Sequence, residues 1–186
     1  MATIAHDYNY PTYAKIIHLG LAIFGIAAYL TAELAVDGNT NLGYLLHAYL
    51  GLSLAAFIVI RIIIGTFSSS TLSFSDWSPF SRHQWGLALV DFRSLLKLQI
   101  PEHDHHQGLA GITQAFGLIV FAWMAFTGTG LFILDTSAES ELFEFIEELH
   151  EIGETLIPLY LGLHVGAVVL HTLSGKPIWK RMFTSQ

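Results

Sequence analysis

The chain has 186 residues, of which 53% are hydrophobic and 12% charged, and its formal net charge is −7. A mean hydropathy of +0.53 is too high for an ordinary soluble domain of this length. The absence of cysteine excludes disulfides, cysteine-ligated iron–sulfur clusters and covalently attached c-type haem.

Four apolar stretches dominate the chain, and each can cross a bilayer, since about 20 residues suffice. We expect spanning helices at about residues 12–35, 42–66, 108–134 and 143–174. The alternative, a soluble bundle, would need a polar stripe on every helix, and the third stretch has no charged residue with which to build one. The sequence therefore predicts an all-α integral membrane four-helix bundle, formed as a single domain over residues 1–186.

The basic residues predict the orientation of this bundle. All eight lie on one side or at a helix end that faces it: Lys15, Arg61, Arg82, Arg93, Lys97, Lys176, Lys180 and Arg181. With four spans, this side holds both termini and the 67–107 connection, and the positive-inside rule makes it cytoplasmic. The chain before Pro11 has no basic n-region and no cleavage site, so we expect the first span to be retained.

The 67–107 connection contains an amphipathic segment and a polar run. In the segment, residues 85–100, apolar side chains alternate with Arg93 and Lys97. It predicts a helix on the inner membrane surface, where basic side chains meet anionic lipid. The run Glu102-His103-Asp104-His105-His106 is compatible with a metal site. No second ligand cluster supports that reading, and a solvated polar turn is the favoured alternative.

Four histidines are placed so that they pair by depth across the bundle. His150 and His164 share one face of the last helix, about four turns and about 21 Å apart. His47 lies at the depth of His150 near the outer side, and His18 lies near the inner side with His164. Ionisable residues inside a membrane are rare and costly, and neutral imidazoles are natural axial ligands of haem iron. The pattern indicates two stacked bis-histidine sites.

Two residues near the inner side have open roles. His171 follows His164 by about two turns on the same stripe, so depth alone leaves either as the partner of His18. We favour His164, and assign His171 to a haem propionate or a quinone headgroup. Arg61 pairs with a propionate or simply snorkels to the interface. Several glycines flank the histidines and would leave room for a porphyrin: Gly20, Gly43, Gly51, Gly162 and Gly166.

Acidic residues gather on the predicted outer side. The 135–149 loop and the start of the last helix hold Asp135, Glu139, Glu141, Glu144, Glu147, Glu148, Glu151 and Glu154, without one Lys or Arg. A solvated face is the usual explanation for such a run. Because the run makes up the long outer loop, it is also a candidate docking surface for a basic partner.

With these residues, the chain resembles the bacterial cytochrome b561-type membrane cytochromes, in the superfamily that includes b-type subunits of nickel–iron hydrogenase and thiosulfate reductase. The resemblance covers nearly the whole chain and rests on His18, on His47 with Gly51 and Arg61, on the run from Leu149 to His164, on Asp91 to His106, and on Thr127-Gly128. It implies two haems b, ligated by His18/His164 and His47/His150, in a bacterial inner membrane.

The resemblance also implies electron transfer between a quinone pool and a partner. Lys15 stands near His18, where the family often has an arginine and a tryptophan, and isoleucines follow Arg61 where a tryptophan is common. The expected cofactor contacts beyond the iron ligands are Lys15, Arg61 and His171.

Three functions are compatible with this pattern. The first is an electron-transfer subunit between quinone and a basic periplasmic redox protein, such as a c-type cytochrome, or a catalytic subunit. The second is a free-standing superoxide-to-quinone oxidoreductase, and the third is a haem-free membrane scaffold. Superoxide is an anion and would be collected faster by a positive outer surface, whereas the predicted outer surface is acidic. We therefore favour the first function, in which the haems supply all the chemistry.

Overall fold

The computed structural model describes residues 10–35, 41–68, 72–74, 77–101, 103, 107–134 and 140–183, and all its regular elements there are helices. Four helices are long and apolar enough to cross a membrane: α1 (Thr12–Leu30), α2 (Leu42–Phe67), α4 (Gly108–Leu134) and α5 (Glu141–Leu173). The shorter elements are η1 (Ala32–Ala35), α3 (Arg82–Leu96) and α6 (Lys180–Phe183). The all-α, four-span prediction is confirmed.

Local chemistry sets the helix ends. Pro11 precedes the first turn of α1, where a missing N–H costs nothing. The α-helix gives way to η1 at Thr31, whose hydroxyl donates to the carbonyl of Ala27 at 2.8 Å. The first α-helix therefore stops short of the expected residue 35. Asn41 caps α2 by accepting the N–H of Gly43 at 3.0 Å.

The start of α5 places the acidic residues from Glu141 onward on a helix. Ser140 caps the helix by accepting the N–H of Phe143 at 3.2 Å. The acidic residues from Glu141 onward therefore lie on helical turns rather than in a loop, and the helix continues through Pro158. Asp135 and Glu139 lie outside the described residues.

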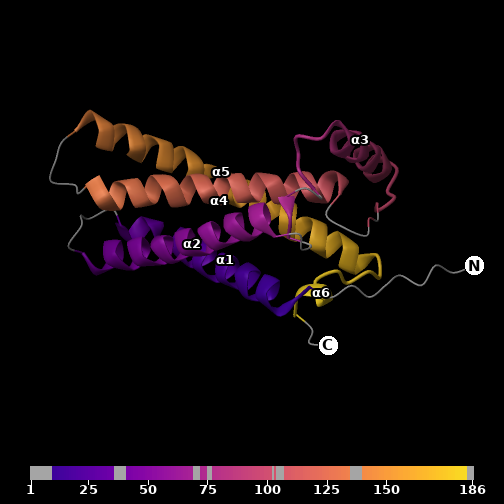
Figure 1. Ribbon diagram of the computed structural model, residues 1–186, viewed down its shortest axis with the longest axis horizontal. Coiled ribbons are helices and arrows are strands. Elements are labelled where there is room, and N and C mark those ends of the chain that lie inside the picture. The colour runs from indigo at the N-terminus through magenta and orange to yellow at the C-terminus, as the bar shows by residue number, and fades with distance from the viewer. Residues whose placement is uncertain are drawn as a thin grey trace, which may run out of the picture.

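The helix α4 is the centre of the bundle. It packs along α5, on α2 and on α3, while α1 packs along α2 (Figure 1). Between the histidine levels lies a cluster of buried apolar residues, Leu54, Ile58 and Phe121, with Phe24 and Tyr160 against it. We call this cluster the middle layer. By contrast, α5 makes few close contacts with α1 or α2.

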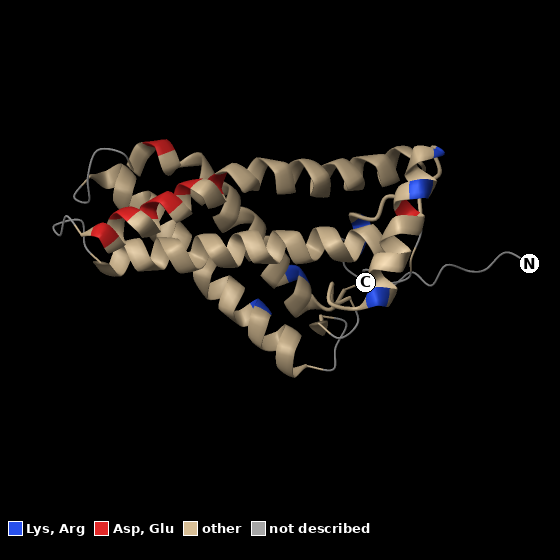
Figure 2. Cartoon of the chain, turned by 90° about the horizontal axis from the view of Figure 1, so that it is seen from above, with Lys and Arg blue, Asp and Glu red and all other residues tan. Residues whose placement is uncertain are grey.

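The helix α3 is amphipathic, with its polar side toward the bundle and its apolar side outward. Its side toward α4 carries the buried residues Gln84, Ala88 and Asp91. Its outer side exposes large apolar side chains: Trp85, Leu89, Val90, Phe92 and Leu96. The helix lies across the long helices near the beginning of α4 (Figures 1 and 2). An apolar outer surface in this position suits lipid. A helix is present in the predicted segment, from Arg82 to Leu96, and its place on the inner membrane surface stays a prediction.

Charges segregate along the bundle. Lys and Arg lie in the half of the molecule that holds the chain ends, and Asp and Glu gather at the opposite end, apart from one acidic residue in α3 (Figure 2). The two ends of the described chain meet, because the N–H of Tyr10 donates to the carbonyl of Arg181 at 3.3 Å. Residues 10 and 181 therefore lie on one side of the bundle.

Candidate functional site

His47 of α2 and His150 of α5 face each other at the acidic end. Their ring centroids are 6.3 Å apart and their planes are nearly perpendicular, at 88°. The Nδ1 atom of His47 lies 2.9 Å from the carbonyl oxygen of Ala28. A carbonyl can only accept, so this Nδ1 carries the proton, and Nε2 keeps its lone pair. The Nδ1 atom of His150 lies 2.8 Å from the hydroxyl of Thr127.

His18 of α1 and His164 of α5 form the second pair. Their ring centroids are 6.2 Å apart, with planes inclined at 43°. Tyr160 stacks on His164 at 5.5 Å, and Phe183 approaches His18 edge-on at 6.2 Å. Within the described residues, no hydrogen bond holds a ring nitrogen of either histidine. The two pairs thus differ in how their rings are fixed.

Both separations fit a single metal ion between each pair of imidazoles. An imidazole nitrogen binds a first-row metal ion such as zinc at about 2.0–2.1 Å. Because ring atoms lie about 1.15 Å from the centroid, two ligands on opposite sides of an ion place their centroids about 6.3–6.5 Å apart. The observed 6.2 and 6.3 Å agree with this geometry. Other ring pairs of the bundle, such as Tyr49 with Phe132 at 6.2 Å, have the same separation, so the spacing is compatible with a metal ion but does not by itself require one.

The glycines near the histidines divide into two groups. A methyl group added at Gly51, Gly162 or Gly166 would meet no atom within 4 Å, so there is open space beside these three. The same methyl group would collide with the ring of Phe57 at Gly20, and with the backbone of Leu34 at Gly43. Open space therefore adjoins three of the five predicted positions, and one of these, Gly162, is exposed at the surface of the bundle. At the other two the prediction was wrong, because neighbouring residues already fill the space.

Arg61 is buried, with 6% of its surface exposed. Its Nη1 donates to the carbonyl of Leu72 at 3.0 Å, and its guanidinium lies over the rings of Phe74 and Trp77, at 5.1 and 5.7 Å from their centroids. Within the described residues, its Nη2 and the Nε1 of Trp77 have no hydrogen-bond partner. Because the Arg61 side chain is buried, it does not simply extend to water at the membrane interface. Two neighbouring unused donors suit an acceptor oxygen such as that of a carboxylate.

Lys15 and His171 lie at the same end of the bundle as the His18 pair. Lys15, His18, Met182 and Phe183 help to line a cavity of about 240 Å³. In the last turn of α5, His171 has a buried Nδ1 without a partner in the described chain. The structure brings His18 to His164, and no ring contact joins His18 to His171 among the described residues.

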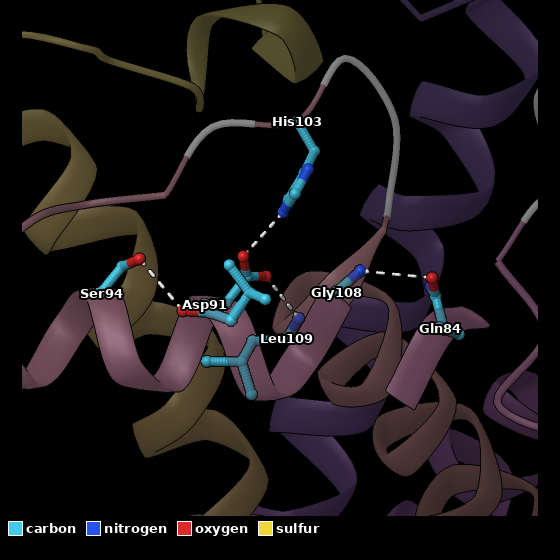
Figure 3. Close-up of polar contacts among 7 residues, drawn as sticks. Gln84, Asp91, Ser94, His103, Gly108 and Leu109 are labelled. Carbon is cyan, nitrogen blue, oxygen red and sulfur yellow. Dashed lines mark hydrogen bonds and ion pairs between the residues drawn. The ribbon is translucent and has the colours of Figure 1, made fainter. Parts of the chain in front are cut away.

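Sequence reasoning missed a polar network beneath α3 (Figure 3). The carboxylate of Asp91 contacts the Nε2 of His103 at 2.8 Å and accepts the N–H of Leu109 at 2.9 Å. Gln84 accepts the N–H of Gly108 at 3.3 Å. Since His103 is tethered, the interpretation of a solvated turn was wrong for this residue, while Glu102 and residues 104–106 lie outside the described chain. Among the described residues, no three potential ligand side chains converge on a metal site.

Fold and site together define a class of protein: a four-span membrane bundle in which histidines from different helices face one another in pairs. A family model described as prokaryotic cytochrome b561 matches residues 9–185, and the chain belongs to this family. It is therefore a membrane b-type cytochrome that binds haem b and transfers electrons. No curated protein and no solved structure matches the chain.

Proposed function

We propose that the protein holds two haems b and passes electrons between the quinone pool and a basic redox partner outside the membrane. His18 and His164 ligate one haem, and His47 and His150 ligate the other. The observation that carries this proposal is the spacing of 6.2 and 6.3 Å between the imidazoles of the two pairs. Haem b, when bound, supplies reversible one-electron chemistry.

The residues around the pairs have supporting roles. Arg61, with the indole N–H of Trp77, binds a carboxylate of the inner cofactor, since each side chain has a buried donor that no described residue accepts. Lys15 contributes a positive charge beside His18. His171 is not an iron ligand in this proposal, and its unused Nδ1 hydrogen-bonds a propionate or a quinone oxygen.

The basic end of the bundle faces the cytoplasm, and the protein lies in the bacterial inner membrane. The segregation of charge along the helices supports this orientation by the positive-inside rule. The absence of cysteine makes a direct test possible. In intact spheroplasts, an impermeant maleimide is expected to label Glu144→Cys and to leave Arg82→Cys unlabelled until the membrane is broken. The reverse pattern would invert the topology.

The exposed acidic turns of α5 are the docking surface for the outer partner. Glu144, Glu147, Glu148 and Glu151 are exposed on this helix, close in sequence to His150. Such a surface attracts a cationic protein and would repel superoxide. The electron-transfer role is therefore favoured over a superoxide oxidoreductase. Family membership speaks against a haem-free scaffold.

Spectroscopy of the purified protein tests the proposal. The dithionite-reduced protein is expected to show a b-type α-band and about two haems per chain by pyridine haemochrome. A value near one haem per chain would refute the paired-site arrangement. Reduction by a quinol, followed by oxidation by a cationic c-type cytochrome, is the expected activity. Fast reduction by superoxide at low salt would instead favour the oxidoreductase.

A further inference from the structure

The two histidine pairs differ in their hydrogen bonding, because both rings of the outer pair have a partner at Nδ1. Thr127 is the partner of His150, and the carbonyl of Ala28 is the partner of His47. Thr127 lies on α4, a helix with no histidine, and only 4% of its surface is exposed. Its Oγ1 lies 2.9 Å from the carbonyl oxygen of Trp123, 3.4 Å from that of Met124, and 2.8 Å from Nδ1 of His150. The hydroxyl therefore joins the backbone of α4 to a side chain of α5.

The arrangement of these atoms determines which way the hydrogen bonds run. A hydroxyl has one proton to donate, and the shortest contact with an atom that can only accept is to the Trp123 carbonyl. With its proton committed there, the oxygen accepts from the ring of His150. Nδ1 of His150 then carries the proton of the neutral imidazole, and the lone pair resides on Nε2, the nitrogen free to bind a metal.

The neighbouring glycine reinforces this placement. A methyl group at Gly128 would lie 3.1 Å from Cε1 of His150, which is closer than carbon atoms normally approach. Thr127 therefore holds the ring on one side, and the missing side chain of Gly128 leaves room for it. The Ala28 carbonyl fixes His47 in the same way, so both rings of the outer pair are anchored through Nδ1.

We propose that Thr127 is a positioning residue that sets the tautomer, ring plane and donor strength of His150, and thereby makes the outer haem spectroscopically and energetically distinct from the inner one. This inference rests on the proposed function. Hydrogen bonding to the second ring nitrogen of a metal-ligating histidine fixes its orientation and raises its basicity as a ligand. A more basic ligand favours Fe(III) over Fe(II), so the bond lowers the midpoint potential.

The ring planes provide the spectroscopic signature. Perpendicular axial imidazoles leave two of the iron d orbitals nearly equal in energy, which gives a strongly anisotropic low-spin EPR signal with one large g value. Planes closer to parallel split these orbitals and give an ordinary rhombic signal. At 88° the outer pair belongs to the first kind, and at 43° the inner pair is displaced toward the second.

The test compares Thr127→Val and Thr127→Ser in the haem-loaded, full-length protein. Loss of such a hydrogen bond typically costs about 10–100-fold in metal affinity. If that change falls on the oxidised iron, each tenfold step raises the midpoint potential by about 59 mV for one electron. Thr127→Val is expected to raise one of the two potentials by one to two such steps and to alter only the strongly anisotropic signal, and Thr127→Ser is expected to restore both.

Thr66→Val is the matched control, since Thr66 donates to the carbonyl of Ile62 at 2.8 Å but contacts no histidine, and it should change neither readout. Unchanged potentials and EPR signals in Thr127→Val, with two haems still bound, would overturn the inference and leave the proposed function standing. If Thr127→Val loses one haem, restoration by Thr127→Ser supports the hydroxyl, and failure to restore it assigns the residue to packing alone. Absence of haem from the wild-type protein would refute the proposed function itself.

Discussion

The carboxylate of Asp91, on α3, accepts the backbone N–H of Leu109 in the first turn of α4 at 2.9 Å. Its other oxygen lies 2.8 Å from Nε2 of His103. Asp91 is only 2% exposed, and no Lys or Arg forms an ion pair with it in the described chain. The positive N-terminal end of α4 therefore stabilises this buried carboxylate, and Asp91 joins Gln84 in fastening α3 to the first turn of α4.

Replacing Asp91 should loosen α3. Asp91→Ala removes two hydrogen bonds to a charged acceptor, and we expect it to destabilise the protein by about 2–3 kcal/mol. His103→Ala removes one of the two and should cost less. Thermal unfolding of the detergent-solubilised protein, followed by circular dichroism, measures both changes. Equal melting temperatures for wild type and Asp91→Ala would show that the network contributes nothing to stability.

The histidine pairs predict haem content one site at a time. His47→Ala and His18→Ala should each lower the pyridine haemochrome value from about two haems per chain to about one, because each removes one of two axial ligands. His171→Ala should retain both haems, and His164→Ala should lose one. The opposite result for the last two variants would make His171 the inner ligand.

The acidic turns of α5 predict a salt-dependent encounter with a cationic c-type cytochrome. The triple variant Glu147→Gln, Glu148→Gln, Glu151→Gln should lower the bimolecular rate at low ionic strength by about tenfold, because steering by the local field is lost. At high salt, wild type and variant should converge. Stopped-flow oxidation of the reduced protein measures this rate. Reduction by quinol is the control, and a parallel loss there would point to damage to the fold.

The apolar outer side of α3 predicts contact with lipid. A spin label at Leu89→Cys should be relaxed strongly by oxygen, which partitions into the bilayer, and weakly by a water-soluble nickel chelate. The same label at Glu148→Cys, on the acidic helix, should show the opposite preference. Leu89 is more than half exposed, so the label itself should not disturb packing. Equal access of both reagents to position 89 would place this helix in water.

The spanning helices could be predicted because length and apolar composition suffice to specify them. The end of α1 was predicted too late, at residue 35, because Ala32, Leu34 and Ala35 continue the apolar composition although Thr31 and Glu33 interrupt it. The hydroxyl of Thr31 turns to the carbonyl of Ala27 there, and nothing in a hydropathy pattern reports such a bond. By contrast, the start of α5 at Glu141, after the cap at Ser140, lies close to the predicted residue 143.

The histidine pairs could be predicted because depth and helix order constrain which rings can meet. The groups that orient the histidine rings were harder to predict from the sequence. The partner of His47 is a backbone carbonyl, for which any residue at position 28 would serve. Thr127 was part of the Thr127-Gly128 motif that resembles the family, but the sequence assigned this residue no role. Arg61 was recognised as unusual, but the aromatic side chains of Phe74 and Trp77 come from a connection whose path the sequence did not specify.

The middle layer of Leu54, Ile58 and Phe121 has a consequence for bioenergetics. The three residues of this cluster are buried and apolar, so a file of water molecules through it would find few hydrogen-bonding partners. If electrons pass between the two levels as proposed, this layer slows the movement of protons along the same path. Each electron that moves between the levels carries its charge through part of the membrane voltage, for which a full crossing is worth about 2.3 kcal/mol per 100 mV. The ratio of reduced to oxidised haem at the two levels would therefore depend on the membrane potential of the cell.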